Sequence, residues 1–198
     1  MASVQQQRGF PMSDEHSVVT SGQRMGVDGW KGRFFEDFEP GDVYYHPLGK
    51  TVSETDNQWF TLLTQNTAKV HFDHNMASVT EFGRPLVNST FILALVTGQS
   101  VIDLSFNVMA NLGWDEVRLP TPVFAGDTIY SRSKVLEKRT SRSRENVGIV
   151  TVATEGYNQD GAIVISYKRT FMVYRRGFAP ENPTPRPDES SLPSVLDV

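Results

Sequence analysis

The stretch Thr90-Phe-Ile-Leu-Ala-Leu-Val-Thr-Gly-Gln-Ser-Val-Ile-Asp103 decides the fold, because it is apolar on nearly every side. It is too short to span a bilayer, which takes about 20 apolar residues as a helix. A short segment that is apolar all round predicts a helix buried on all its faces. Asn88 or Ser89 is expected to cap this helix, since their side-chain oxygens can accept free amide hydrogens of its first turn.

The segments after this helix are typical of strands, and those before it predict both short strands and a helix. Runs rich in Val, Ile, Thr and Tyr predict long antiparallel strands at Trp114–Leu119, Thr128–Arg139, Gly148–Tyr157 and Ala162–Tyr174. Asn158-Gln-Asp-Gly161 predicts a hairpin turn, in which the glycine can adopt a positive φ. Earlier in the chain we expect short strands at Val43–Tyr45 and Leu48–Val52, then a helix capped by Ser53.

One buried helix followed by a meander of strands predicts an α+β domain at residues 29–177, with an antiparallel sheet wrapped around the helix. This is a single hot-dog fold per chain. Its exposed sheet edges favour a homodimer, or a dimer of dimers or trimers, because strand edges tend to pair. Residues 1–28 are polar and are expected to form a flexible arm. Residues 178–198 are expected to form a proline-rich tail, since proline lacks the amide donor of helices and sheets.

Composition excludes several classes of function. The chain has 198 residues and a formal net charge of −4. It contains no cysteine, so disulfides, thiolate metal sites and cysteine nucleophiles are excluded. Neither sign of charge forms a long run, which argues against a nucleic-acid partner. The polar amino-terminal stretch has no secretory signal, and no segment is long enough to cross a membrane, so a cytoplasmic location without a membrane partner is expected. The sequence contains no set of metal ligands and no nucleotide-binding motif.

Histidine is the natural candidate for proton transfer near neutral pH. His71 lies in the polar stretch Thr64-Gln-Asn-Thr-Ala-Lys-Val-His-Phe-Asp-His74, just before the predicted buried helix. It either faces a pocket and shuttles a proton, or it is a surface or capping residue. Its spacing to other residues leaves both interpretations open.

A tight Gly-Arg-Pro turn at residues 83–85 leads directly into the predicted buried helix. The amino end of a helix presents backbone N–H groups that have no partner within the helix. Such groups can hold a thioester oxygen as negative charge develops on it. An ordinary capped helix start is the alternative interpretation of this segment.

Taken together, the two stretches resemble the motifs of the MaoC-like hydratases, which include the (R)-specific enoyl-CoA hydratases. The family pattern Ser-Gly-Asp-x-Asn-Pro-aliphatic-His-x-Asp is matched by Thr64–Asp73, and Phe-x-x-Pro-Ile-Val-His-Gly by Phe82–Ser89. The likeness extends over residues 33–174. It implies a hot-dog dimer that acts as a hydro-lyase, adding water to the double bond of an acyl-CoA thioester. No cofactor is implied beyond the coenzyme A of the substrate.

The resemblance assigns roles to individual residues. His71 matches the catalytic histidine, and Asn66 stands where the catalytic aspartate usually stands. Ser89 matches the glycine whose amide helps to form the oxyanion hole, Asn88 replaces the histidine before it, and Thr97 falls near a polar position that assists the site. Because an amide cannot take up a proton as a carboxylate does, His71 would carry the acid–base work and Asn66 would fix the water.

Two further assignments concern charged residues near these motifs. Asp73 either orients His71 or caps a short helix through Met76–Val79. Arg84 is a candidate substrate-binding residue, and it shares with Lys69, Arg118 and Arg169 the possibility of meeting the phosphates of coenzyme A. A solvated surface charge is the alternative for each of the four cations.

The change from aspartate to Asn66 also bears on the substrate. A substrate with its own carboxylate would be repelled by an aspartate in a poorly solvated pocket, whereas asparagine would tolerate it. The segments Leu62–Thr67 and Arg84–Phe91 are similar to those of a branch that handles branched C5 dicarboxylyl-CoA thioesters such as itaconyl-CoA or mesaconyl-CoA. A hot-dog acyl-CoA thioesterase, which would release free CoA, and a catalytically silent acyl-CoA-binding module remain alternative functions.

Overall fold

The structure is a computed structural model that describes residues 29–181. Contacts divide the chain into a unit of residues 1–30 and a unit of residues 31–198, and the elements below all belong to the second unit. The predicted arm at residues 1–28 lies outside the described residues, as does the tail from residue 182 onward.

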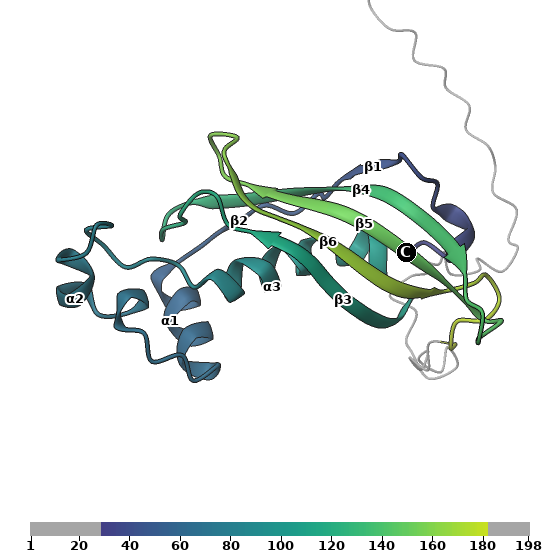
Figure 1. Ribbon diagram of the computed structural model, residues 1–198, viewed down its shortest axis with the longest axis horizontal. Coiled ribbons are helices and arrows are strands. Elements are labelled where there is room, and N and C mark those ends of the chain that lie inside the picture. Colours follow the sequence, from purple (N-terminus) through teal and green to yellow (C-terminus); the bar gives the residue numbers. More distant parts are fainter. Residues whose placement is uncertain (1–28, 182–198) are drawn as a thin grey trace, which may run out of the picture. The chain divides into compact units, whose positions relative to one another are not determined.

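An antiparallel sheet forms the larger part of this unit (Figure 1). Its strands are β1 (Val43–Tyr45), β2 (Lys50–Thr51), β3 (Val108–Arg118), β4 (Thr128–Thr140), β5 (Val147–Tyr157) and β6 (Ile163–Tyr174). The order is β1-β4-β5-β6-β3, with β2 beside β4. The predicted meander is therefore confirmed for β4, β5 and β6, and it is wrong for β3, which pairs with β6 instead of β4.

The strand bounds show where local pattern was a poor guide. β3 begins at Val108, although the predicted strand begins at Trp114. Its first half includes Asn111 and Gly113, which have low strand propensity, and pairing with β6 overrides that preference. The predicted strand Leu48–Val52 is reduced to Lys50–Thr51. The hairpin at residues 158–161 is confirmed, with Gly161 at a φ of +79°.

The helical elements are η1 (Phe35–Asp37), α1 (Glu54–Leu63), η2 (Lys69–His71), α2 (His74–Ser78), α3 (Ser89–Gln99) and the π-helical turn η3 (Val101–Ser105). α1 is capped by Ser53, as predicted. The Ser53 Oγ accepts from the Asp56 amide at 3.1 Å, and Asp56 Oδ2 accepts from the Ser53 amide at 2.9 Å. This reciprocal pair fixes the start of α1.

Helix α3 packs against the sheet, and Asn88 caps it by accepting from the Thr90 amide at 2.9 Å. Gly156 on β5 permits the close approach of the helix, because a Cβ at this position would lie 2.7 Å from Val96 Cγ2. Burial on all faces was a wrong prediction for the single chain: Ile92 and Val96 are buried, but Ala94 and Gly98 are exposed. The sheet covers one side of the helix, and the sequence pattern cannot say what covers the other. The hot-dog architecture itself is confirmed.

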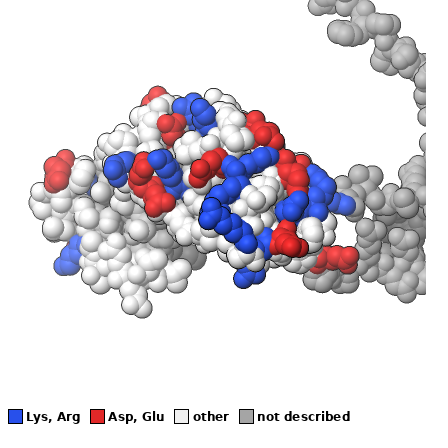
Figure 2. Space-filling view, turned by 45° about the vertical axis from the view of Figure 1, so that its right-hand side comes forward, with Lys and Arg blue, Asp and Glu red and all other residues white. Residues whose placement is uncertain are grey.

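The surface charges are interspersed by sign on the face drawn in Figure 2. Several exposed or half-exposed pairs join neighbouring strands, including Arg132 with Glu155 at 2.7 Å and Lys168 with Glu116 at 2.6 Å. None of the helices in the described part of the chain combines the length and hydrophobicity needed to cross a bilayer.

Candidate functional site

His71 ends the short helix η2 and is held by the backbone that leads into α3. Its Nδ1 lies 2.8 Å from the carbonyl oxygen of Leu86. Since a carbonyl can only accept, Nδ1 must carry a proton, and in the neutral imidazole the lone pair is then on Nε2. The local backbone thus selects the tautomer in which Nε2 can act as a base.

Asn57, on α1, ties this histidine to the start of α3. Its Nδ2 donates to the carbonyl oxygen of His71 at 2.8 Å and to that of Leu86 at 3.2 Å. Its Oδ1 accepts from the Asn88 amide at 2.8 Å. The residue is 3% exposed, so these bonds are shielded from water. Asn57 is therefore a positioning residue that joins three elements at the site.

The sequence interpretation missed Asn57, although the sequence contains a signal for it. Asn57 and Thr61 are one helical turn apart on α1, and both are buried in positions where a helical pattern leads one to expect core residues. Buried polar side chains need partners, so such a pair indicates an internal network. Thr61 supplies part of it, since its Oγ1 accepts from Asn88 Nδ2 at 3.2 Å.

A cavity of about 210 Å³ lies beside His71. Its lining is mainly polar or charged and consists of Glu54, Asn57, Gln58, His71, His74, Arg84, Pro85 and Ala125. Glu54 and His74 lie 3.7 Å apart within this lining. His71 therefore borders a space that a small polar group can enter.

Ser89, the first residue of α3, lines a second cavity of about 200 Å³. Most of the other lining residues are apolar, namely Phe82, Leu86, Val87, Ile92, Leu119, Pro122 and Val123. Pro85 lines the first cavity and its neighbour Leu86 lines the second. Within one chain, His71 and Ser89 thus line different cavities, which are bordered by the consecutive residues Pro85 and Leu86.

Asn66 and Asp73 both cap local backbone. Asn66 Oδ1 accepts from the Ala68 amide at 2.9 Å, and Asn66 lines neither cavity. Asp73 Oδ1 accepts from the Met76 amide at 3.0 Å and caps α2. Of the two interpretations of Asp73, the structure displays the helix cap. Among residues 29–181, no hydrogen bond joins Asp73 to His71.

Asn88 and Thr97 are engaged inside the chain. Asn88 Oδ1 accepts from both the amide and the hydroxyl of Thr90, at 2.9 and 2.7 Å. The hydroxyl of Thr97 lies 3.2 Å from the Tyr167 hydroxyl and accepts from Trp114 Nε1 at 3.3 Å. Neither residue lines the two cavities. Their contacts hold the amino end of α3 and its sheet-facing side.

The four candidate cations lie in different environments. Arg84 lines the His71 cavity, whereas Lys69 and Arg118 are exposed elsewhere. Arg169 is 4% exposed and donates to Asn111 Oδ1 at 2.6 Å and to Ser100 Oγ at 3.2 Å. Burial also lowers the pKa of Arg169 from its ordinary value. Its burial places Arg169 out of reach of a coenzyme A phosphate at the surface.

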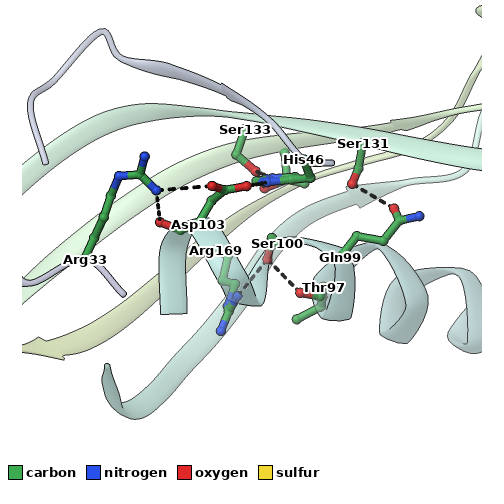
Figure 3. A network of polar contacts seen from close by, with 10 residues as sticks. Arg33, His46, Thr97, Gln99, Ser100, Asp103, Ser131, Ser133 and Arg169 are labelled. Atoms are coloured by element: carbon green, nitrogen blue, oxygen red, sulfur yellow. Dashed lines mark hydrogen bonds and ion pairs between the residues drawn. The ribbon is translucent and has the colours of Figure 1, made fainter. Parts of the chain in front are cut away.

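A second polar cluster, centred on His46, was not predicted from the sequence (Figure 3). His46 Nδ1 donates to Asp103 Oδ2 at 2.9 Å, and Ser133 Oγ lies 2.9 Å from Nε2. Asp103 is also paired with Arg33 at 3.1 Å. The order of acid, imidazole and hydroxyl is that of a nucleophilic triad, but the His46 side chain is fully buried and neither cavity includes the cluster. We interpret it as a structural network.

This network makes stability depend on pH. Burial lowers the pKa of His46 below 6.5, and the hydrogen bond to Asp103 opposes this effect in part. The unfolded chain therefore binds a proton at a higher pH than the folded chain does. We expect the free energy of unfolding to fall as the pH decreases from about 7 to about 5, as urea denaturation would measure, and His46→Gln should flatten the profile. A wild-type protein that gains stability over this interval would contradict the expectation.

Known proteins are similar in sequence to most of this chain. The sequence model of a family described as mesaconyl-CoA hydratase matches residues 13–186. A mesaconyl-CoA hydratase of Cereibacter sphaeroides is 36% identical over 160 residues, which are 78% of this chain and 45% of that protein. A beta-methylmalyl-CoA dehydratase of Chloroflexus aurantiacus is 32% identical over 167 residues, covering 84% of this chain and 47% of that protein. The chain thus spans about half the length of the curated relatives it matches.

A solved structure is similar over the same region. The crystal structure of a putative MaoC domain protein dehydratase from Chloroflexus aurantiacus has a TM-score of 0.72 and 32% identity. The match covers 82% of this chain and 46% of that one. Most of this chain is therefore similar in fold to a solved structure of a MaoC domain protein.

Proposed function

We propose, given that this chain belongs to the mesaconyl-CoA hydratase family of MaoC-like proteins, that it hydrates an enoyl-CoA thioester or catalyses the reverse dehydration. The substrate we propose is a branched C5 dicarboxylyl-CoA, either mesaconyl-CoA or itaconyl-CoA. The names of the relatives support this substrate class, because they describe hydration and dehydration of such thioesters. The observation that carries the proposal is His71 at a cavity with its Nδ1 fixed and its Nε2 able to accept a proton.

The proposed reaction uses both cavities, with the double bond beside His71 and the thioester oxygen beside Ser89. His71 Nε2 accepts a proton from water while the water oxygen bonds to the β-carbon. The electron pair of the double bond shifts, and negative charge develops on the thioester oxygen. The Ser89 amide lies at the first position of α3, where the helix supplies no acceptor, and it would donate to that oxygen. The imidazolium then returns a proton to the α-carbon, so that H and OH have been added in total.

We propose that Asn66 holds the attacking water without adding charge, which requires its Nδ2 to reach the His71 cavity that Asn66 does not line in the single chain. Asn66→Asp tests this, because aspartate can still accept from the Ala68 amide and therefore keeps the local turn. A carboxylate near a second carboxylate raises the energy of the complex, so KM for mesaconyl-CoA should rise about tenfold while KM for crotonyl-CoA changes by less than about threefold. Steady-state kinetics on both thioesters measures the difference, and equal changes for the two would contradict it.

The reaction type is tested by following the enoyl absorbance and free thiol in one sample, with mesaconyl-, itaconyl- and crotonyl-CoA in turn. Hydration removes the absorbance and releases no thiol. Thiol release with the absorbance retained would identify a thioesterase, and binding without turnover would identify a silent binding module. Activity on crotonyl-CoA alone would reject the dicarboxylate substrate.

We also propose that the chain pairs with a second copy to form a homodimer, alone or within a larger assembly. β3 is an edge strand with exposed Leu112 and Trp114, and the uncovered side of α3 includes Ala94 and Gly98. A second chain would cover both features. Sedimentation should give at least twice the chain mass of 22.2 kDa, and a monomer at micromolar concentration would contradict this.

Two predictions from the sequence accompany this proposal. We expect a cytoplasmic location, which cell fractionation can test. We expect activity without any cofactor beyond the coenzyme A of the substrate, so treating the protein with a chelator should leave the rate unchanged.

A further inference from the structure

The turn that carries Arg84 is fixed on both sides. Gly83 has a φ of +67°, a conformation that suits glycine, and its amide donates to the carbonyl of Thr80 at 3.1 Å. On the other side, the Leu86 amide donates to the carbonyl of Val70 at 3.0 Å, and Leu86 forms a bridge with Phe124. These contacts hold the backbone of Arg84 close to the segment that carries His71.

The Arg84 side chain is exposed in the single chain and is oriented by a neighbouring aromatic ring. The guanidinium carbon of Arg84 lies 3.9 Å from the centre of the Phe124 ring. Phe124 itself is anchored, because its amide donates to Asp127 Oδ2 at 2.9 Å and its ring contacts Phe82. A guanidinium stacked on a ring keeps its N–H groups free at its edge, where they can form two parallel bonds to a carboxylate.

The charged side chains that line the cavity favour the binding of an anion at the edge of the Arg84 guanidinium. Within residues 29–181, Arg84 forms no ion pair with an acidic side chain. Glu54 is the one carboxylate in the lining, and it lies 3.7 Å from His74. In the described part of the chain, Arg84 is therefore a cation that is oriented by Phe124 and has no acidic partner, in a cavity that it shares with His71.

The chemistry of the substrate requires such a group near His71. In mesaconyl-CoA the free carboxylate is attached directly to a carbon of the double bond. Any side chain that binds this carboxylate must therefore be close to the group that acts on the double bond. We propose that Arg84 binds the free carboxylate and so selects dicarboxylyl over monocarboxylyl thioesters, an inference that rests on the proposed function. A contact with the coenzyme A phosphates would serve all thioesters alike, and the test separates the two.

The test compares two variants. Arg84→Met removes the charge and keeps an apolar stem, and Arg84→Lys keeps the charge but lacks the paired N–H donors of the guanidinium. Arg144→Met, on the exposed turn between β4 and β5, is the matched control for loss of one positive charge. A charge-assisted hydrogen bond contributes about 1.5–3 kcal/mol, so Arg84→Met should raise KM for mesaconyl-CoA by about 10- to 100-fold. Arg84→Lys should give a smaller rise, and KM for crotonyl-CoA should change by less than about threefold.

Equilibrium binding of the same two thioesters separates failure of this inference from failure of the proposed function. If the wild-type protein hydrates neither thioester, the proposed function fails. The inference about Arg84 still stands in that case if Arg84→Met weakens binding of mesaconyl-CoA alone. It is overturned if both thioesters bind more weakly to the same extent, if neither is affected, or if the wild type binds crotonyl-CoA as tightly as mesaconyl-CoA.

Discussion

Replacing His71 with alanine should lower kcat/KM for hydration of mesaconyl-CoA by about three orders of magnitude, within the range of a lost general acid–base group. The fold should survive, because among the described residues the side chain makes one hydrogen bond, to the Leu86 carbonyl, and otherwise borders a cavity. The loss should therefore lie in kcat, with the Kd for mesaconyl-CoA changed by less than about threefold. Steady-state kinetics and equilibrium binding together measure this.

Chemical rescue provides the control for the His71→Ala result. Added imidazole can occupy the space left by the side chain and should restore part of the rate, in proportion to its neutral form. An unchanged kcat in His71→Ala would contradict the role of the imidazole. A rate lost together with folded structure, as circular dichroism would reveal, would instead make His71 a structural residue.

Replacing Asn57 with leucine should have the second-largest effect. It removes three hydrogen bonds and leaves the carbonyl of His71 and the amide of Asn88 without a partner, whereas the Leu86 carbonyl still accepts from His71 Nδ1. Each buried group left unpaired costs about 1–3 kcal/mol, so the free energy of unfolding should fall by about 3 kcal/mol or more. The turnover number should fall about 100-fold at a temperature where the variant is still folded, because His71 is no longer held in place.

Two comparisons separate positioning from general stability. Asn75→Leu makes the same change on the exposed surface of α2 and should alter neither property. Asn57→Asp keeps an acceptor for the Asn88 amide but cannot donate to the two carbonyls, so its kcat should fall while the cap of α3 remains. The ¹⁵N spectrum of the His71 ring should show Nδ1 losing its fixed proton in the Asn57 variants. A variant that is less stable but has the wild-type kcat and spectrum would contradict the positioning role.

The fold could be predicted where local rules decide. The caps at Ser53 and Asn88 follow from hydrogen bonds within one turn, and the hairpin before β6 follows from Gly161. Pairing of β3 with β6 could not be predicted, since it joins residues far apart in the chain. The exposed side of α3 was also missed, because hydrophobic periodicity reports that a face is covered and does not say which chain covers it.

The site residues that could be predicted are likewise those that local sequence motifs indicate. His71 and the turn around Arg84 were found from the two motifs, which are local. Asn57 was missed because its partners are 14 to 31 residues away and belong to other elements. The contact of His46 with Asp103 spans 57 residues, and no local pattern indicates it. The sequence left two possible roles for Asp73, and in the structure it caps α2.

The most direct measurement is mass analysis of the thioester recovered after incubation with mesaconyl-CoA. The wild-type protein should yield an intact CoA thioester heavier by one water molecule, and His71→Ala should yield unreacted mesaconyl-CoA over the same interval. Free CoA as the product, or hydration by His71→Ala at the wild-type rate, would contradict the account.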